Sequence, residues 1–369
     1  MKEGWEIKKL GEICQIRTGK KDVNQGNPNG KYPFFTCAAQ HTFSDSYSFD
    51  TEALLVAGNG NVGQVSYYQG KFEAYQRTYV LSDFSEIDSR YLFFILDGKL
   101  KEAVSKQKLG NTMPYIKVGM LRDFLVPIPP ICEQNRIVTI LDEAFDGIAI
   151  AKANAEKNLQ NARALFESHL QSVFTQRGEG WVEKPLGEIG KVSMCKRIFK
   201  EQTKSAGDIP FYKIGTFGKE ADAFISKEIY KEYRNNHPFP KKGDVLISAS
   251  GTIGRRVVYN GEDAYFQDSN IVWIANDQKK LLNHYLYHFY GACEWNPTKG
   301  ATISRLYNDN LRQIKISFPE SLHEQHSIAV QIDALNEETQ RLESLYQRKI
   351  AALDALKKSL LHQAFSGNI

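Results

Sequence analysis

The stretch ALLVAGNGNVGQVSYYQG at residues 53–70 returns in altered form as DVLISASGTIGRRVVYNG at residues 244–261. Each copy has a β-branched and aromatic run, a turn with two glycines three positions apart, and a second such run, so each predicts two strands joined by a glycine turn. The turn does not fit a nucleotide-binding loop, because a Walker A loop needs G-x-x-x-x-G-K-[ST] and a dinucleotide fingerprint opens a helix. Its recurrence decides the fold: the sequence is a tandem duplication.

Three further stretches recur in the same order. GWEIKKLGEI at 4–13 returns as GWVEKPLGEI at 180–189, YPFFTCAAQ at 32–40 returns as IPFYKIGTF at 209–217, and GNTMPYIKVGMLRDFLVPIPPICEQNRI at 110–137 returns as GATISRLYNDNLRQIKISFPESLHEQHSI at 300–328. A repeat of this length is a whole domain with its tail, not a solenoid unit. We predict an α+β fold with β-rich domains at 1–131 and 180–322, each followed by a long helix, at 132–179 and 323–369.

The two predicted helices carry apolar residues at alternating spacings of four and three, which is typical of a coiled coil. Glu133-Gln134 and Glu324-Gln325 are predicted to open them, with an acid in the first turn as the helix dipole favours. Each helix should run for roughly 60 Å at 1.5 Å per residue, long enough to act as a spacer. The predicted seam residues are Ile137, Leu141, Ile148, Leu165, Ile328, Ile332, Leu335, Leu342, Leu353, Leu356 and Leu360.

Composition sets broad limits on the class of protein. Among 369 residues, 42% are hydrophobic and 24% are charged, as in an ordinary globular protein. A membrane-spanning run and an amino-terminal signal are both missing, so we expect a cytoplasmic protein. Five cysteines, an odd number without a C-x-x-C pair, favour neither a disulfide framework nor a zinc cluster. The net charge of +4 lies in the two β-rich segments, whereas the tails are net negative, which is a modest indication of polyanion binding.

Three motifs that resemble catalytic signatures are better explained as structure. LDEAFD at 141–146 lies in a heptad helix without a Walker A partner, and HEQH at 323–326 has its histidines at i,i+3 rather than the i,i+4 spacing of H-E-x-x-H. NPTK at 296–299 lacks the second proline and the aromatic residue of the adenine methyltransferase motif. We therefore predict a non-catalytic chain without a metal site or a cofactor of its own.

Polar residues at matching places in the two repeats are the candidates for contact with nucleic acid. Glycine turns let the main chain approach a phosphodiester, while neighbouring polar side chains bond phosphates or base edges. Each such residue taken singly is at least as well explained by ordinary surface polarity. The candidates are Lys20, Lys21, Asn61, Gln64, Lys108, Asn111 and Thr112 in the first repeat, and Lys196, Arg197, Thr252, Arg255, Arg256, Lys299, Thr302 and Arg305 in the second.

Nearly the whole chain resembles the specificity subunit of type I restriction–modification systems. The resemblance rests on the GW…LGEI start, the GNVG and GTIG turns, and VPIPPICEQNRI and SFPESLHEQHSI leading into long helices. It implies two target-recognition domains related by a pseudo-twofold axis and separated by two antiparallel coiled-coil helices, each domain reading one half of a bipartite DNA target. The second repeat has FPE where the family has two prolines, which blurs the start of that helix.

The resemblance also implies partners. Modification (methyltransferase) subunits, two in number, and restriction (translocase and nuclease) subunits would bring S-adenosylmethionine, ATP and magnesium. Two alternatives stay open on sequence alone: the specificity subunit of a type IIB-like system, and a non-catalytic coiled-coil adaptor that does not bind DNA. A phosphate-using enzyme is a third, and it would require nucleotide binding by the isolated chain.

Overall fold

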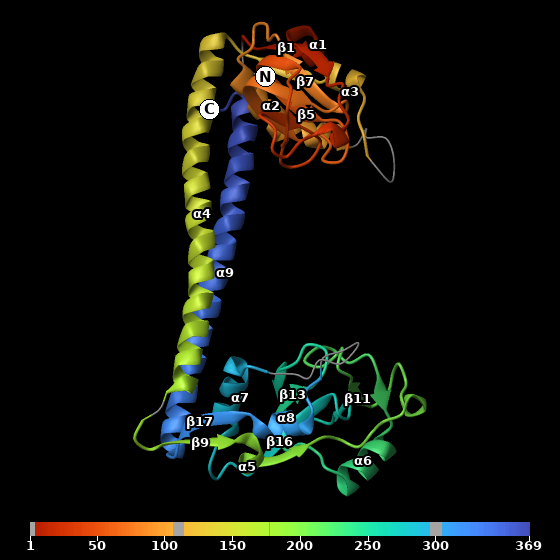
Figure 1. The fold of residues 1–369 in the computed structure, drawn as a ribbon, viewed down its shortest axis with the longest axis vertical. Coiled ribbons are helices and arrows are strands. Elements are labelled where there is room, and N and C mark those ends of the chain that lie inside the picture. The colour runs from red at the N-terminus through yellow and green to blue at the C-terminus, as the bar shows by residue number, and fades with distance from the viewer. Residues whose placement is uncertain (1–3, 106–113, 177, 296–304) are drawn as a thin grey trace. The chain divides into compact units, whose positions relative to one another are not determined.

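The computed structural model describes residues 4–105, 114–176, 178–295 and 305–369, which form two compact units. Unit 1 comprises residues 1–156 and 347–369, and unit 2 comprises residues 157–346. Two long helices, α4 (Ile131–Thr175) and α9 (Leu322–Ser366), each begin in one unit and end in the other (Figure 1). Among the described residues, no helix is long and apolar enough to cross a membrane.

Unit 1 is built on a six-stranded sheet with the strand order β2-β7-β5-β6-β3-β4, beside a separate antiparallel pair, β1 and β8. Leu54 of β5 faces a core that includes helix α2, while its neighbour Leu55 faces a smaller cluster around Phe35 and Phe72, as alternation along a strand requires. The elements are β1 (Glu6–Lys9), α1 (Leu10–Ile13), β2 (Gln15–Thr18), η1 (Val23–Gln25), β3 (Tyr32–Phe35), β4 (Thr42–Ser44), β5 (Phe49–Ala57), β6 (Val65–Ala74), β7 (Thr78–Ser82), α2 (Ser89–Ser105), α3 (Val118–Arg122) and β8 (Leu125–Ile128).

Unit 2 has a four-stranded sheet in the order β10-β16-β13-β14, a three-stranded sheet β12-β11-β15 and the pair β17-β9. Ile247 of β13 faces a core with helix α7, and Leu246 faces the other side. The elements are β9 (Trp181–Pro185), α5 (Leu186–Ile189), β10 (Gly190–Ser193), η2 (Lys200–Gln202), β11 (Ile209–Tyr212), β12 (Phe224–Ile225), α6 (Lys227–Asn236), β13 (Val245–Ser248), β14 (Arg256–Val258), β15 (Tyr265–Phe266), β16 (Ile271–Asn276), α7 (Asn283–Ala292), α8 (Asn308–Gln313) and β17 (Lys315–Pro319).

The two units repeat one topology. The order β2-β7-β5-β6 in unit 1 matches β10-β16-β13-β14 in unit 2, and the parallel pairing of β3 with β6 matches that of β11 with β15. In unit 2 the long strand equivalent to β6 is divided into β14 and β15. The short helices α1 and α5 have the same sequence, LGEI, and bury the same leucine and isoleucine. The predicted duplication and the α+β class are both confirmed.

A buried glutamine fixes the first turn of helix α4 to unit 1. Gln134 is fully buried, accepts a hydrogen bond from the Asp88 amide at 2.7 Å, and donates to the carbonyls of Glu86 and Pro129 at 3.1 and 2.9 Å. Its side-chain amide thus pairs one amide and two carbonyls of the chain segments that precede the helix. Helix α4 begins at Ile131, two residues before the predicted start.

Gln325 makes the same three contacts in unit 2. It accepts from the Leu282 amide and donates to the carbonyls of Lys280 and Pro319, all at 2.8 Å, and it is also fully buried. Helix α9 begins at Leu322, again two residues before the predicted start. The EQ dipeptide shared by the two repeats is therefore a matched anchor, which the sequence interpretation treated as helix-start chemistry alone.

The long helices are antiparallel, as predicted. In unit 1, Lys152 Nζ lies 2.8 Å from Asp354 Oδ1, and in unit 2, Arg163 Nε lies 2.9 Å from Glu343 Oε1. The second pair lies eleven residues later in α4 and eleven residues earlier in α9. These exposed pairs each contribute little energy, but they define the register of the two helices.

Two of the predicted seam residues are wrong. Leu165 is 68% exposed, and its neighbour Phe166 packs into the core of unit 2 instead. Leu356 is 47% exposed, while its neighbour Lys357 lies over the ring of Phe145 on the other long helix. The other nine predicted seam residues are buried or half-buried. Both errors fall about four heptads after the first seam residue, because a straight helix drifts by about 20° per heptad against a strict 3.5-residue repeat.

We predict that Gln134→Ala lowers the free energy of unfolding of unit 1 by about 2–3 kcal/mol, since it removes the partner of the half-buried Asp88 amide and Glu86 carbonyl and of the buried Pro129 carbonyl. Urea unfolding followed by circular dichroism measures this, with separate transitions allowed for the two units. Gln160→Ala, at an exposed position of the same helix, is the control and should change stability by less than about 0.5 kcal/mol. Equal losses in the two variants would contradict the anchor.

Candidate nucleic-acid interface

Both glycine turns have the predicted conformation. Gly60 and Gly63 between β5 and β6 have φ of +59° and +79°, and Gly251 and Gly254 between β13 and β14 have φ of +63° and +83°. Side-chain-bearing residues rarely adopt these angles, so the glycines are required by the turn itself. A β-carbon on Gly254 would also lie 2.2 Å from the indole nitrogen of Trp295.

Segments far apart in the sequence converge on the turn of unit 1. The Gly58 amide donates to the carbonyl of Arg77 at 3.0 Å, and the Ile116 amide donates to the carbonyl of Gly58 at 2.9 Å. Gln64 Nε2 donates to the carbonyl of Ala39 at 3.3 Å. The turn thus joins the β6–β7 connection, the segment after β3 and the residues just after the undescribed stretch 106–113.

The turn of unit 2 gathers the equivalent segments. The Ala249 amide donates to the carbonyl of Asn270 at 2.7 Å, and the Leu306 amide donates to the carbonyl of Ala249 at 2.8 Å. Arg255 Nη1 donates to the carbonyl of Phe217 at 2.9 Å, in the place of the Gln64 contact. We call each set of converging segments a loop cluster: residues 20–21, 36–41, 57–64, 75–78 and 115–116 in unit 1, and residues 196–197, 213–217, 248–255, 267–270 and 305–306 in unit 2.

Four of the predicted contact residues are exposed within the clusters. Asn61 and Thr252 lie in the two glycine turns, and Lys20 and Lys196 lie at matching positions after the first sheet strand of each unit. Neither lysine forms an ion pair with any residue that the structure describes. These side chains are therefore free to meet a polyanion.

Lys21 and Arg197 have acidic partners inside their own units. Lys21 Nζ lies 3.3 Å from Glu73 Oε2, on a carboxylate that is 1% exposed, and donates to the hydroxyls of Ser44 and Ser46 at 2.8 and 2.6 Å. Arg197 Nε lies 2.9 Å from Asp268 Oδ2. Lys21 thus neutralises a buried charge, and its predicted contact with DNA stays a prediction.

The two adjacent arginines of the second repeat have different neighbours, Arg255 just before strand β14 and Arg256 at its first position. Arg255 bonds the Phe217 carbonyl, while the guanidinium of Arg256 lies 4.6 Å from the ring centroid of Tyr287 on helix α7 and its Nε is buried. Arg256 thus lies against helix α7, and its predicted phosphate contact stays a prediction. Arg305 is also held internally, since it donates to the carbonyl of Ser269 at 3.1 Å.

The remaining predicted contacts, Lys108, Asn111, Thr112, Lys299 and Thr302, lie outside the described residues, so their roles stay predictions.

A polar groove of about 460 Å³ opens beside the glycine turn of unit 1. Sequence reasoning missed it, although YPFFTCAAQ was identified as a repeated stretch. It also missed Arg77, whose carbonyl accepts a hydrogen bond from the Gly58 amide of the turn. The Arg77 side chain is exposed and forms no ion pair with an acidic residue that the structure describes. The polar residues that line the groove are Thr36, Gln40, His41, Gln64, Ser66 and Thr78.

Fold and site define a class: a tandem-repeat protein that builds one polar, partly basic loop cluster twice, each domain leading into a long helix. The profile of the family described as "Type I restriction modification DNA specificity domain" matches residues 2–161 and 178–350. The chain belongs to this family, because the two matches together cover most of its length.

Relatives and solved structures agree with the family. The chain is 38% identical over 352 residues to a putative type I restriction enzyme specificity subunit of Haemophilus influenzae, covering 90% of this chain and 88% of the relative. It is 26% identical to the EcoDI specificity subunit of Escherichia coli, covering 99% and 88%. A structure from a study of complex assembly in a type I restriction–modification system has a TM-score of 0.77 at 18% identity, covering 100% and 99%. The HsdS subunit of Thermoanaerobacter tengcongensis has a TM-score of 0.60, covering 100% and 98%.

We predict different effects for the adjacent lysines of unit 1. Lys21→Ala should lower the free energy of unfolding by about 2 kcal/mol or more, because it leaves the buried Glu73 carboxylate without its cation. Lys20→Ala, the matched control, should change stability by less than about 0.5 kcal/mol. Thermal unfolding of the two variants side by side measures the difference, and a stable Lys21→Ala variant would show that Glu73 does not need this cation.

Proposed function

We propose that this chain is the sequence-specific DNA-binding specificity subunit of a type I restriction–modification complex, and that each unit reads one half of a bipartite target. The observation that carries the proposal is the doubled loop cluster, in which the framework is repeated while the polar side chains of the glycine turn differ. Asn61 and Gln64 in unit 1 stand where unit 2 has Thr252 and Arg255. A shared frame with different polar side chains suits two different half-sites. Family membership supports the same function.

Within the clusters, different side chains would contact the phosphates and the bases. Lys20 and Lys196 would contact phosphates, which position a protein on the duplex but carry no sequence information. Thr36, Gln40 and His41 in the groove of unit 1 can hydrogen-bond base edges in the major groove. The net positive charge of the recognition segments would add a salt-dependent attraction to any DNA.

The chain itself would carry no catalytic step, because specificity subunits of type I systems are generally non-catalytic. We propose that methylation and ATP-dependent cleavage take place in two modification subunits and in restriction subunits, which bind S-adenosylmethionine, ATP and magnesium, in a cytoplasmic complex. Four exposed apolar residues of the long helices offer docking surface for the modification subunits: Ile150, Leu165, Leu345 and Leu356.

Replacing the two free lysines should weaken binding to every DNA sequence without changing the preferred one. In Lys20→Ala with Lys196→Ala, each lost phosphate contact should lower the slope of log affinity against log salt by about one. Electrophoretic binding assays at several salt concentrations, with and without modification subunits, measure affinity, slope and preference together.

Lys242→Ala is a control that removes one lysine elsewhere, since Lys242 is exposed near the end of β13 that lies away from the glycine turn. It should leave the salt slope unchanged. A changed target sequence in the double variant would mean that these lysines read bases. Sequence-selective binding absent from the assembled complex would favour a non-DNA adaptor.

The helices that join the repeats are proposed to set the gap between the half-sites. Inserting seven residues after Leu159 in α4, and seven after Gln347 in α9, separates the Lys152–Asp354 pair from the Arg163–Glu343 pair while keeping both. It adds about 10 Å of helix at 1.5 Å per residue and turns the helix by about 20°. The half-sites should be unchanged and the gap longer, by up to about three base pairs at 3.4 Å each.

Methylome sequencing of cells carrying the insertion variant reads both the half-sites and the gap. An unchanged gap at full activity, or altered half-sites with an unchanged gap, would contradict a spacer role. A four-residue insertion in both helices is the comparison, because it rotates the seams out of contact and should abolish activity.

A further inference from the structure

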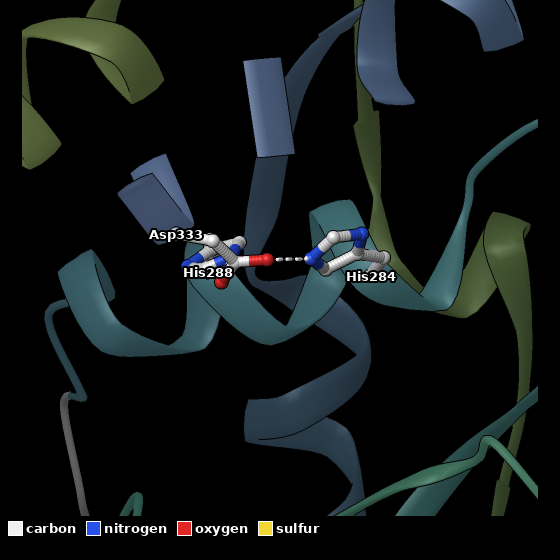
Figure 2. Close-up of side chains that lie close together, drawn as sticks. All are labelled: His284, His288 and Asp333. Carbon is white, nitrogen blue, oxygen red and sulfur yellow. Dashed lines mark hydrogen bonds and ion pairs between the residues drawn. The ribbon is translucent and has the colours of Figure 1, made fainter. Parts of the chain in front are cut away.

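Two histidines and one aspartate of unit 2 meet away from the loop cluster. His284 and His288 lie one turn apart on helix α7 and so share a face, and Asp333 comes from helix α9 (Figure 2). His284 Nε2 lies 2.6 Å from Asp333 Oδ2, and His288 Nε2 lies 2.9 Å from Asp333 Oδ1. The carboxylate therefore stands between two imidazoles.

This arrangement leaves one buried nitrogen unsatisfied. His288 is 3% exposed, and its buried Nε2 has no hydrogen bond of good geometry, although Asp333 Oδ1 lies 2.9 Å away. A buried polar atom without a partner is costly, and a native structure has a reason for each one.

We propose that His284, His288 and Asp333 bind one divalent transition-metal ion, with Zn²⁺ as the best match. Neutral imidazole nitrogens and a carboxylate oxygen are the ligand atoms that zinc takes in proteins, and three protein ligands leave a position for water. The three ligand atoms lie within 4.8 Å of one another, so small side-chain rotations suffice to surround an ion. The ion would give the buried His288 nitrogen a partner and would separate it from the carboxylate oxygen.

Two neighbours shape the site. The ring centroid of His326, which is two turns before Asp333 on α9, lies 6.2 Å from that of His284, close enough to hold the ring in place. The second histidine of the HEQH motif therefore borders the proposed site. Arg256 adds positive charge beside His288, so we expect weaker binding than in closed four-ligand zinc sites.

Unit 1 has a different interaction at the repeat position of this cluster. The Gln134–Asp88 contact of unit 1 is equivalent to the Gln325–Leu282 contact of unit 2. Counted from these contacts, Arg90 has the repeat position of His284, and Asp142 has the repeat position of Asp333. Arg90 and Asp142 form an ion pair, and Arg90 also lies over the ring of Phe94, at the position of His288. The contact between the domain and its long helix at this position is thus an arginine–aspartate ion pair in unit 1 and the set of proposed metal ligands in unit 2.

The test uses untagged full-length protein, stripped with chelator and dialysed. Titration with Co²⁺ should produce visible absorption without the near-ultraviolet bands of thiolate ligation, and Zn²⁺ titrated calorimetrically should bind once per chain and raise the melting temperature. Asp333→Asn and His284→Asn should each weaken binding by more than about tenfold. Both positions are partly exposed, so these variants should fold.

Asp142→Asn, the matching change in unit 1, is the control and should bind Zn²⁺ like the unchanged protein. His326→Asn should weaken binding less than a ligand variant does. Absence of Co²⁺ and Zn²⁺ binding, or equal affinity in Asp333→Asn and the unchanged protein, would overturn the proposal and leave a hydrogen-bonded His–Asp cluster. Neither outcome bears on DNA recognition, which the salt-slope assay tests separately.

Discussion

The side-chain amide of one glutamine in each repeat is the contact on which the architecture depends. Gln134 and Gln325 are fully buried, and each connects the first turn of a long helix to two main-chain segments of the domain before it. An amide can donate and accept in one plane, so it fixes direction as well as position. A hydrophobic residue there could fill the space but could not orient the helix. The start of each long helix is thus set by its own domain.

The same frame supports different surfaces in the two repeats. Strand order, the glycine turn and its main-chain bonds are kept, while the groups at the turn differ: Gln64 bonds one carbonyl where Arg255 bonds the equivalent one. The joint between domain and helix differs as well, an arginine–aspartate pair in one unit and two histidines around an aspartate in the other. After the duplication, the hydrogen bonds that define the chain path were therefore kept, while the side chains around them changed.

Much of the fold was predictable because repetition exposes it: the two domains, the long helices and the glycine turns all follow from recurring stretches. The site was less predictable. Lys20 and Lys21 are indistinguishable by sequence, yet only Lys21 lies beside a buried carboxylate, Glu73, more than fifty positions away. Arg255 and Arg256 are adjacent in sequence, yet Arg255 bonds the Phe217 carbonyl and Arg256 lies over the ring of Tyr287. Leu165 and Leu356 were misplaced because a fixed heptad ignores the helix's own pitch. A sequence pattern shows neither the partners that the fold brings together from distant positions nor the rotation that a helix accumulates over several heptads.

The ends of the long helices have a consequence for ancestry. Phe174 ends the helix that follows the first domain, yet its ring packs on Tyr285 and Phe289 of the second; Phe365, at the same repeat position, packs on Tyr91 of the first. Each repeat thus completes the apolar core of the other. A single-repeat ancestor would have left these aromatic helix ends uncovered unless a second copy supplied its domain in exchange. The gene fusion that made the present chain would then have turned a swapped homodimer into one polypeptide, after which each half could change its DNA contacts without changing the other.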